Sequence, residues 1–322
     1  MVRVVPLILS SRSAPAYLMP GSFRFKIPRA CGTPISDSSY FGTVHPECNM
    51  LKSFSVAFVC HVVLLCPLYP LSAVAEGAFD LVDIPAGQVQ LGDAQGDDNE
   101  VVRRLELPAF RIMRFEVTNA QFRRFLEESG YQTDVERQGE GYTWWRRWES
   151  VAGADWRHPQ GPESSIDGKA DHPVVQVSAR DADAFCRHYG LRLPSDEEWE
   201  YSARSGDGRR FPWGNNAPLS PSEKLANAGS IACCGPDDGD GYARTAPVGS
   251  FPAGRSPFGL FDMAGNVWEW TSSSFPGKPS ERALRGGGWG NNPYCLRTAY
   301  RHGNPPDIGL DMVGFRCAGD LE

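Results

Sequence analysis

Residues 284–317 read LRGGGWGNNPYCLRTAYRHGNPPDIGLDMVGFRC, a segment too irregular for a plain helix or strand. Its three consecutive glycines permit left-handed backbone angles and close chain approach, and its two Asn-Pro pairs are turn residues. Arg297 and Arg301 lie four residues apart, so they would share one face of a helical turn. A single thiol, Cys295, lies near the middle. The pattern indicates a surface built to carry a site; the alternative is a long structural loop.

The composition is that of an ordinary globular protein, rich in glycine and large aromatic side chains. The 322 residues are 41% hydrophobic and 22% charged, and they include nine Trp and 34 Gly, which favours a loop-rich fold over a helical bundle. The length suffices for one large domain or two small ones. The formal net charge of -7 gives no basic footprint, so nucleic acid is not an expected partner.

Residues 50–75, MLKSFSVAFVCHVVLLCPLYPLSAVA, have the pattern of a secretory signal peptide. Lys52 supplies a short positive region, an apolar run follows, and Ala73-Val74-Ala75 is a small-x-small cleavage signature. A membrane anchor is the alternative, but two prolines and a histidine make a poor spanning helix. We therefore expect a periplasmic or secreted protein with no stable membrane span after cleavage. Residues 1–49 would then be a non-native upstream extension, with translation starting at Met50.

The predicted mature chain is acidic and has an odd number of cysteines. Residues 76–322 contain 26 Lys and Arg against 37 Asp and Glu, a formal net charge of -11. Such a protein is suited to binding cations rather than polyanions. An odd cysteine count in an oxidising compartment leaves at least one thiol unpaired or bonded to another molecule. The five cysteines of this part are Cys186, Cys233, Cys234, Cys295 and Cys317.

Residues 79–320 are predicted to form one α+β domain with little regular secondary structure. Apolar–polar alternation predicts strands in the first third and again near the middle. The predicted elements are a β-hairpin over 79–92, an acidic loop over 94–100, a strand pair over 104–117 and a short strand over 172–177.

Helices are predicted to begin after Thr118, Ser178 and Ser195, since each is a good N-cap and the last two open capping boxes. Between the first two helices, residues 131–171 read as a long aromatic loop that wraps the core or carries function. Packing against the core is the expected role of its tryptophans, and little regular structure is expected after residue 215.

Two acidic segments could bind a hard cation. Asp262 and Glu269 bracket Ala-Gly-Asn, and calcium takes six to eight oxygen ligands from carboxylates and backbone carbonyls. The alternative is that Glu269 pairs with a nearby arginine. Asn227 with the acidic run 237–242 is the second candidate, and a solvated acidic turn is its alternative. It is not an EF-hand, because Gly249 stands where the closing Glu would be.

Cys295 is a candidate for chemistry if Arg297 lowers its pKa, since the thiolate is the reactive form. The alternative is a disulfide to Cys233 or Cys234. Those two are adjacent, and a vicinal disulfide would be strained, so one of them could pair elsewhere and leave the other free. The nucleotide-binding, hydrolase, metalloprotease and redox motifs G-x-x-x-x-G-K-[ST], G-x-S-x-G, H-E-x-x-H and C-x-x-C do not occur.

Across nearly all of residues 79–320 the chain resembles the formylglycine-generating enzyme (sulfatase-modifying factor) family. The resemblance implies a formylglycine-generating-enzyme-like fold: a single α+β domain with a C-type-lectin-like core and low regular secondary structure. The matching segments, in order, are Ile84–Gly87, Glu116–Asn119, Trp156–Pro159, Asp171–Val174, Leu191–Ser195 with Glu198–Glu200, Phe211–Asn215, Gly265–Trp270 and Gly314–Cys317.

The resemblance also implies two calcium sites and a disulfide. One calcium site would use Asn227, the Ala228 carbonyl, Asp240 and the Tyr242 carbonyl. The other would use Asp262, the Gly265 and Val267 carbonyls, and Glu269. The implied disulfide joins Cys186 to Cys317. The family's second disulfide would need cysteines near Ala203 and Thr298, and both are missing.

The loop around Cys295 departs from the family pattern. Members that generate formylglycine have two cysteines there, spaced C-x-x-x-x-C, which bind copper(I) and activate oxygen to oxidise a substrate cysteine. Here the loop is shorter, reads GGGWGNNPYCLR and contains one cysteine. Two thiolates suit soft, linear copper(I), and a single thiolate binds it poorly. Copper is therefore not an expected cofactor, whereas calcium is.

Three functional hypotheses follow. The first is an exported oxidative maturation enzyme, resembling the periplasmic branch of the family that finishes the chromophore of the siderophore pyoverdine. The second is a genuine formylglycine-generating, sulfatase-activating oxidase whose cysteine pair is Cys295 with Cys233 or Cys234. The third is a non-catalytic binding module, because lectin-like folds often only bind. The expected substrate is a small molecule or a peptide-derived group.

Four residues of the segment are predicted to face that substrate. Trp289 and Tyr294 would wall a planar group, and Cys295 or His302 would handle protons or redox steps.

Arg297 and Arg301 are predicted to bind anionic groups of the same substrate. The alternative for each arginine is a structural salt bridge, to Asp307 or Glu269.

Overall fold

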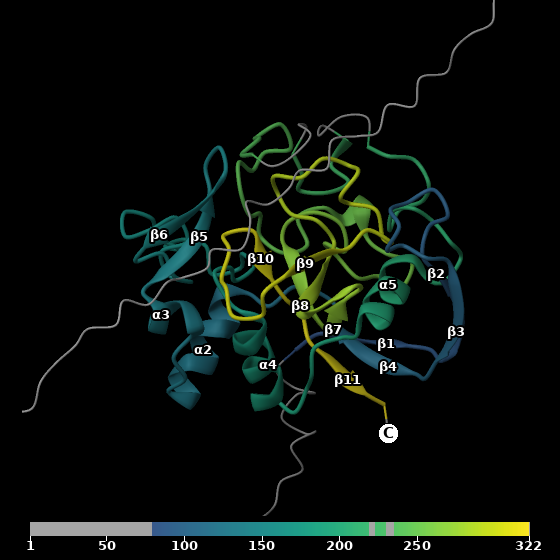
Figure 1. The fold of residues 1–322 in the computed structure, drawn as a ribbon, viewed down its shortest axis with the longest axis horizontal. Coiled ribbons are helices and arrows are strands. Elements are labelled where there is room, and N and C mark those ends of the chain that lie inside the picture. Colours follow the sequence, from purple (N-terminus) through teal and green to yellow (C-terminus); the bar gives the residue numbers. More distant parts are fainter. Residues whose placement is uncertain (1–78, 219–222, 230–234, 322) are drawn as a thin grey trace, which may run out of the picture. The chain divides into compact units, whose positions relative to one another are not determined.

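The computed structural model describes residues 79–218, 223–229 and 235–321 (Figure 1). Short helices and small sheets joined by long turns confirm the predicted α+β class with little regular secondary structure. The predicted extension 1–49, the predicted signal peptide 50–75, and Cys233 and Cys234 lie outside the described residues. Within the described ranges no helix has both the length and the apolar character needed to cross a membrane.

The first four strands form one long ribbon that bends in the middle. Strand β1 (Leu81–Ile84) pairs antiparallel with β4 (Phe110–Met113), and β2 (Gly87–Leu91) pairs antiparallel with β3 (Arg103–Leu107). The two ladders follow each other in register, because Ile84 lies opposite Phe110 and Gly87 lies opposite Leu107.

Prolines explain why two strand predictions are wrong in detail. Residues 79–92 do not fold back as a hairpin, and β3 and β4 do not pair with each other. Pro85 and Pro108 lie in the two interruptions of the ribbon, and a proline cannot donate a ladder hydrogen bond. The chain therefore bends at each proline and continues in the same direction. As a result β1 pairs with β4 and β2 pairs with β3.

The C-terminal strand β11 (Ala318–Asp320) completes a three-stranded sheet in the order β1-β4-β11. It pairs antiparallel with β4, so that Ala318 and Val82 flank Ile112 from opposite sides. The first and last strands of the described part therefore lie in one sheet (Figure 1).

Three helices begin where the sequence predicts. Thr118, Ser178 and Ser195 are the N-caps, and each closes a capping box with the residue three positions later. A fourth, α3, is a five-residue helix with the same box at Thr133, and it was not predicted. The helices are α2 (Asn119–Ser129), α3 (Asp134–Gln138), α4 (Ala179–His188) and α5 (Asp196–Arg204).

The predicted aromatic loop over 131–171 is partly regular. Besides α3 it contains a hairpin of β5 (Glu140–Trp144) and β6 (Trp148–Ala152), closed by a pair of tryptophan rings 5.3 Å apart at its tip. The predicted strand over 172–177 is absent from the described structure, where only an isolated bridge joins Thr118 to Pro173. Gln176 has a φ of 58°, a left-handed conformation that ends any extended run.

The prediction of little regular structure after residue 215 is also wrong in part. Strands β7 (Trp268–Phe275) and β8 (Lys278–Arg285) form a hairpin of two eight-residue strands. Their sheet has the order β10-β7-β8-β9, with β9 (His302–Asn304) and β10 (Val313–Gly314) at its edges. Strand β7 was not predicted because its second half, TSSSF, lacks the alternation of apolar and polar residues that indicates a strand.

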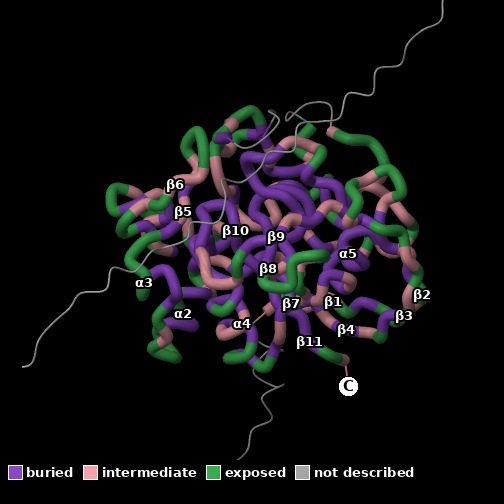
Figure 2. Tube along the Cα trace, in the orientation of Figure 1, coloured by how far each residue is buried: buried purple, intermediate pink, exposed green. Residues whose placement is uncertain are grey.

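Buried residues concentrate in the centre of the described part (Figure 2). The larger apolar cluster packs the rings of Phe122, Phe185 and Phe315 around the disulfide Cys186–Cys317, which confirms that pairing. Trp156 is 1% exposed and packs against Phe122, as expected for a core tryptophan. A second cluster lies around Trp199 and joins α5 to the ribbon.

Removing the disulfide should destabilise the domain strongly. Its cysteines are 131 residues apart, so the bond restricts a long loop of the unfolded chain, and losing such a bond costs about 2–5 kcal/mol. We expect the Cys186→Ala, Cys317→Ala double variant to unfold at a clearly lower denaturant midpoint than the oxidised wild type. Reduced wild-type protein is the control and should match the variant. Equal midpoints for variant and oxidised protein would contradict the expectation.

Candidate functional site

The predicted site lies on the connection between β8 and β9, residues 286–301, which we call the Cys295 loop. Gly286 and Gly287 turn the chain with φ of 92° and 75°. A Cβ on Gly287 would lie 3.1 Å from the Cys295 carbonyl oxygen, so the loop folds back on itself at a place that favours glycine.

Cys295 is the free cysteine of the described part of the chain, and it is buried. Burial raises the pKa of its thiol to about 11, against the smaller lowering effects of a hydrogen bond from the Tyr300 hydroxyl and of the Arg297 charge. Arg297 lowers the pKa of the thiol as predicted, but burial outweighs its charge, so the thiol is not activated. At neutral pH Cys295 is a protonated thiol.

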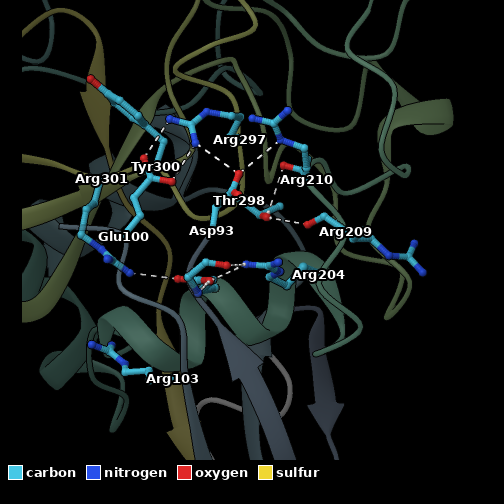
Figure 3. Close-up of polar contacts among 12 residues, drawn as sticks. Asp93, Glu100, Arg103, Arg204, Arg209, Arg210, Arg297, Thr298, Tyr300 and Arg301 are labelled. Atoms are coloured by element: carbon cyan, nitrogen blue, oxygen red, sulfur yellow. Dashed lines mark hydrogen bonds and ion pairs between the residues drawn. The ribbon is translucent and has the colours of Figure 1, made fainter. Parts of the chain in front are cut away.

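Arg297 binds the acidic loop that precedes β3 (Figure 3). Its guanidinium donates two hydrogen bonds to Glu100, at 2.7 and 2.8 Å, and lies 3.4 Å from Asp93. Its charge also lies 4.3 Å above the ring of Tyr294. Arg297 and Glu100 are both buried, so this arginine is a structural clamp rather than a ligand for a substrate anion. Its partners differ from the two acids considered as alternatives.

Arg301 is likewise held in a buried ion network. It lies 2.9 Å from Glu200 and 3.1 Å from Asp196, both on α5. Arg285, at the end of β8, pairs with the same two carboxylates at 2.6 Å each. Burial alone would raise the pKa of Asp196, but Arg285 and Arg301 hold it below its ordinary value. The predicted anion-binding role of Arg301 is therefore not supported.

Glu200 is the centre of this network. Its second oxygen accepts from Arg204 at 2.7 Å and from the Gly92 backbone N–H at 2.6 Å. One carboxylate thus joins α5, the end of β2, the end of β8 and the Cys295 loop, through three arginines and one backbone amide. Glu200 lies in a segment that the sequence comparison with the family singled out, but no role could be read from it.

The two aromatic residues predicted to wall the site lie in different environments. Trp289 is fully buried; its indole donates to the Asp311 carbonyl at 3.1 Å, and Arg244 lies 4.7 Å from its ring. It holds the loop and offers no surface to a substrate, so its predicted role is wrong. Tyr294 is 49% exposed, and its hydroxyl donates to Asp97 of the acidic loop. Tyr294 can therefore face a substrate.

His302 is the first residue of β9. A row of aromatic rings in contact connects it to Tyr300, which is hydrogen-bonded to Cys295. The rings of His302 and Trp268 are 5.8 Å apart, those of Trp268 and Tyr300 are 5.9 Å apart, and those of Tyr300 and Tyr294 are 5.6 Å apart. Burial lowers the pKa of His302, so its imidazole is neutral at pH 7 and can accept a proton.

Tyr300, Trp268 and the acidic loop are parts of the site that sequence reasoning missed. Tyr300 is recognisable only by its position five residues after Cys295. The acidic loop was predicted, but its contact with residues almost two hundred positions away left no local signal.

The first predicted calcium set is brought together. Asn227 is buried and directs its amide nitrogen to the Arg244 carbonyl and to Asn266, while its amide oxygen has no partner within the described structure. Asp240 is also buried, and its two oxygens accept from the backbone N–H groups of Ala228 and Tyr242. A buried amide oxygen without a donor, beside a buried carboxylate, fits a hard oxygen-seeking cation.

The second predicted calcium set is denser in charge. Asp262 is buried, and burial raises its pKa to about 6. Glu269 makes a bidentate pair with Arg316, the kind of arginine contact considered as its alternative, and its role as a calcium ligand stays a prediction. Buried Glu116, whose pKa is also raised by burial, lies beside them.

Three acids thus share one arginine, and a divalent cation would offset the buried negative charge that remains. The described residues contain no cluster of three His, Cys, Asp or Glu side chains arranged around one metal. The proposed ligands include backbone carbonyls, which suits calcium rather than a transition metal.

Comparison with known proteins identifies the family to which this fold belongs. Residues 72–321 match the family model described as the sulfatase-modifying factor enzyme 1-like domain. The chain is 36% identical to the formylglycine-generating enzyme of Bos taurus over 286 residues, covering 74% of each chain. It is 37% identical to the inactive C-alpha-formylglycine-generating enzyme 2 of Mus musculus over 285 residues, covering 80% of this chain and 90% of the relative.

Two further similarities bear on the chemistry. The chain is 36% identical to the hercynine oxygenase of Mycolicibacterium smegmatis over 275 residues, covering 74% of this chain and 60% of the relative. Among solved structures, PvdO from Pseudomonas aeruginosa superposes with a TM-score of 0.58 at 26% identity, covering 76% of this chain and 95% of PvdO.

Neutralising Glu200 should destabilise the fold far more than neutralising its neighbour. In Glu200→Gln three buried arginines lose their shared charge, and breaking a buried pair costs about 3–5 kcal/mol. Glu197→Gln removes the partially exposed pair with Arg103 from the same helix, which should cost below about 1 kcal/mol. Denaturant unfolding of both variants measures the difference; similar losses would show that Glu200 is not the centre of the network.

Cys295 should react as a high-pKa thiol. With a pKa of about 11, its thiolate fraction at pH 8 is about 100-fold below that of a free cysteine. We expect iodoacetamide labelling, followed peptide by peptide with mass spectrometry, to rise steeply only above about pH 10. Tyr300→Phe removes a hydrogen bond that favours the thiolate, so it should move the inflection higher. An inflection at or below pH 8.5 would contradict this environment.

Proposed function

The chain belongs to the sulfatase-modifying factor enzyme 1-like family, and from that premise we propose that it is an exported oxidising enzyme that completes a siderophore chromophore of the pyoverdine type. The family includes oxidising enzymes, among them a relative named as an oxygenase. The fold likeness to PvdO and the sequence resemblance to the pyoverdine branch support the finer assignment. Dioxygen is the electron acceptor we propose.

The observation that carries this proposal is the lone, buried, protonated thiol of Cys295. A copper(I) site of the formylglycine-generating type needs two thiolates, and within the described residues Cys295 has no cysteine beside it. The Cys295 loop is held in place by the ion pairs of Arg297 and Arg301 and by the buried indole of Trp289. An enzyme of this family that uses the Cys295 loop for a different oxidation would need neither a second thiolate nor copper. We therefore assign no copper to this site.

The residues that would act on a substrate are those with an exposed or titratable face. Tyr294 presents its ring to solvent beside Cys295 and would stack on a planar group. Neutral His302 would accept a proton, and the thiol of Cys295, bonded to Tyr300, would donate or return one. Arg297 and Arg301 would act only by holding the loop.

Two calcium ions are part of the proposal. One would be bound by Asn227, Asp240 and the carbonyls of Ala228 and Tyr242. The other would be bound by Asp262, Glu269 and the carbonyls of Gly265 and Val267. These calcium ions would stabilise the fold. They would neutralise buried carboxylates and hold irregular segments of the chain in one conformation.

The proposed setting is the periplasm or the outside of the cell, and the proposed partner is a small-molecule or peptide-derived substrate. The predicted signal peptide and the acidic predicted mature chain support export and argue against nucleic acid as a partner.

A second candidate is formylglycine generation with a rearranged cysteine pair. Gly235, which directly follows Cys233 and Cys234 in the chain, donates its backbone N–H to the Gly290 carbonyl of the Cys295 loop at 3.1 Å. This contact places Gly235 against the loop that bears Cys295, and it is the observation that favours this candidate. The third candidate, a non-catalytic binding module, has support from the relative named as inactive.

One experiment separates the three functions. The gene is deleted in its own organism and complemented with wild type, Cys295→Ala or Glu197→Gln, and siderophore intermediates are analysed by mass spectrometry. We expect an unmatured chromophore precursor to accumulate in the deletion strain and with Cys295→Ala, and to disappear with wild type and with the Glu197→Gln control.

Purified protein then completes the test. Oxygen consumption on the accumulated precursor alone would support siderophore maturation. Consumption on a sulfatase-derived cysteine peptide, lost in a Cys233→Ser, Cys234→Ser variant, would establish the second candidate instead. No precursor and no oxygen consumption on either substrate would leave the binding module as the function.

A further inference from the structure

Asn266 lies within one proposed calcium set and is bonded to the other. It stands between Gly265 and Val267, whose carbonyls belong to the second set. Its side-chain oxygen accepts from the amide nitrogen of Asn227 at 3.0 Å, and its backbone N–H donates to the Asn227 carbonyl at 2.8 Å. Asn227 belongs to the first set, so two direct hydrogen bonds join the two sets through a single residue.

The other end of the Asn266 side chain fixes the second set. Its amide nitrogen donates to Glu116 at 2.6 Å, and the other oxygen of Glu116 accepts from the Val267 backbone N–H at 3.2 Å. The side-chain oxygen of Asn266 also accepts from the Ala246 N–H at 2.9 Å. Asn266 and Glu116 are buried, at 1% and 0% exposed, so neither can exchange these partners for water.

The backbone at this point allows little adjustment. Asn266 has a φ of 59°, a left-handed conformation that asparagine tolerates and most residues do not. A Cβ on Gly265 would lie 2.3 Å from the Asn227 carbonyl oxygen, so the two segments already touch. A shift of Asn227 must therefore move Asn266, and with it the two carbonyls that flank it.

The same residue touches the Cys295 loop. The Asn266 carbonyl accepts from the Trp289 N–H at 2.8 Å, and the Gly265 N–H donates to the Gly286 carbonyl at 3.0 Å. The loop's turn and its buried tryptophan are thus bonded to the segment that carries the second set.

We propose that Asn266 couples the two calcium sites to each other and to the Cys295 loop, so that calcium at one site preorganises the other site and orders the loop. The proposal rests on the calcium binding put forward in the proposed function. Asn266 accepts from the amide nitrogen of Asn227 and so leaves the amide oxygen of Asn227 free for a cation. Asn266 also lies between Gly265 and Val267, so its position sets the position of the two carbonyls of the second set. Partners of metal ligands commonly change metal affinity by about 10- to 100-fold.

Calcium titration of the metal-stripped full chain by calorimetry tests the coupling. Asp240→Asn disables the first set and Asp262→Asn the second, so each variant should bind one calcium where the wild type binds two. Calcium should bind the remaining site at least about 5-fold more weakly than in the wild type, and by the same factor in both variants, because coupling is reciprocal.

Asn266→Gly removes the side-chain hydrogen bonds to Asn227, Ala246 and Glu116 and keeps the backbone bonds, without backbone strain, because glycine accepts the left-handed angle. In this background Asp240→Asn should change the affinity of the second site by a clearly smaller factor than it does with Asn266 present, because only the backbone bond to Asn227 remains. Asn119→Ala is the matched control: Asn119 is also buried, and its side-chain nitrogen donates to the Lys169 carbonyl, away from both sets. Its coupling should equal that of the wild type. If Asn266→Gly does not fold, the reciprocity of the two aspartate variants decides alone.

Hydrogen exchange supplies a second readout that does not depend on activity. Chelation should speed exchange in peptides spanning residues 286–297, and Asn266→Gly should show that faster exchange even with calcium present. Two calcium ions bound independently, or exchange in the loop unaffected by calcium, would overturn the coupling and leave calcium binding intact. No calcium bound at all would overturn both.

Discussion

A single buried carboxylate, that of Glu200, joins parts of the chain that lie far apart in the sequence. Charged groups taken out of water are destabilising unless each finds partners. Glu200 satisfies Arg204, Arg285 and Arg301 at once, together with the Gly92 N–H. A domain with short helices and small sheets cannot fix its loops by secondary structure. It fixes the Cys295 loop by charge, and Arg297 with Glu100 repeats the same solution a few residues away.

Local chemistry was readable from the sequence, and long-range pairing was not. The N-caps Thr118, Ser178 and Ser195 were predictable because a cap residue, and for the last two the rest of its capping box, lies within four residues. The α+β class came from the pattern of predicted strands and helices, whereas the disulfide and the lectin-like core came from the family resemblance. The ribbon was misread because its strands pair across an interruption, and the partners of Arg297 and Arg301 were missed because those acids lie about 100 to 200 residues away.

At the candidate site, the sequence predicted which residues lie there better than it predicted what each of them does. The sequence placed Cys295, Tyr294 and His302 in one segment, residues 284–317, and the structure joins them through Tyr300 and Trp268. It could not show that Trp289 is fully buried, nor that burial outweighs the charge of Arg297 at the thiol. Both facts depend on how densely the surrounding chain packs, which no local pattern encodes.

The sheet that contains both β1 and β11 has a practical consequence for engineering. The start of β1 at Leu81 lies opposite Met113 and the end of β11 at Asp320 lies opposite Phe110, so the two ends are two strand spacings apart, about 10 Å, and about 10 Å apart along the strands. A few flexible residues could join these ends, and the chain could then be reopened at a remote turn such as the tip of the β5–β6 hairpin. Circular permutants of this kind would show whether folding requires the order in which the segments are synthesised or only their contacts.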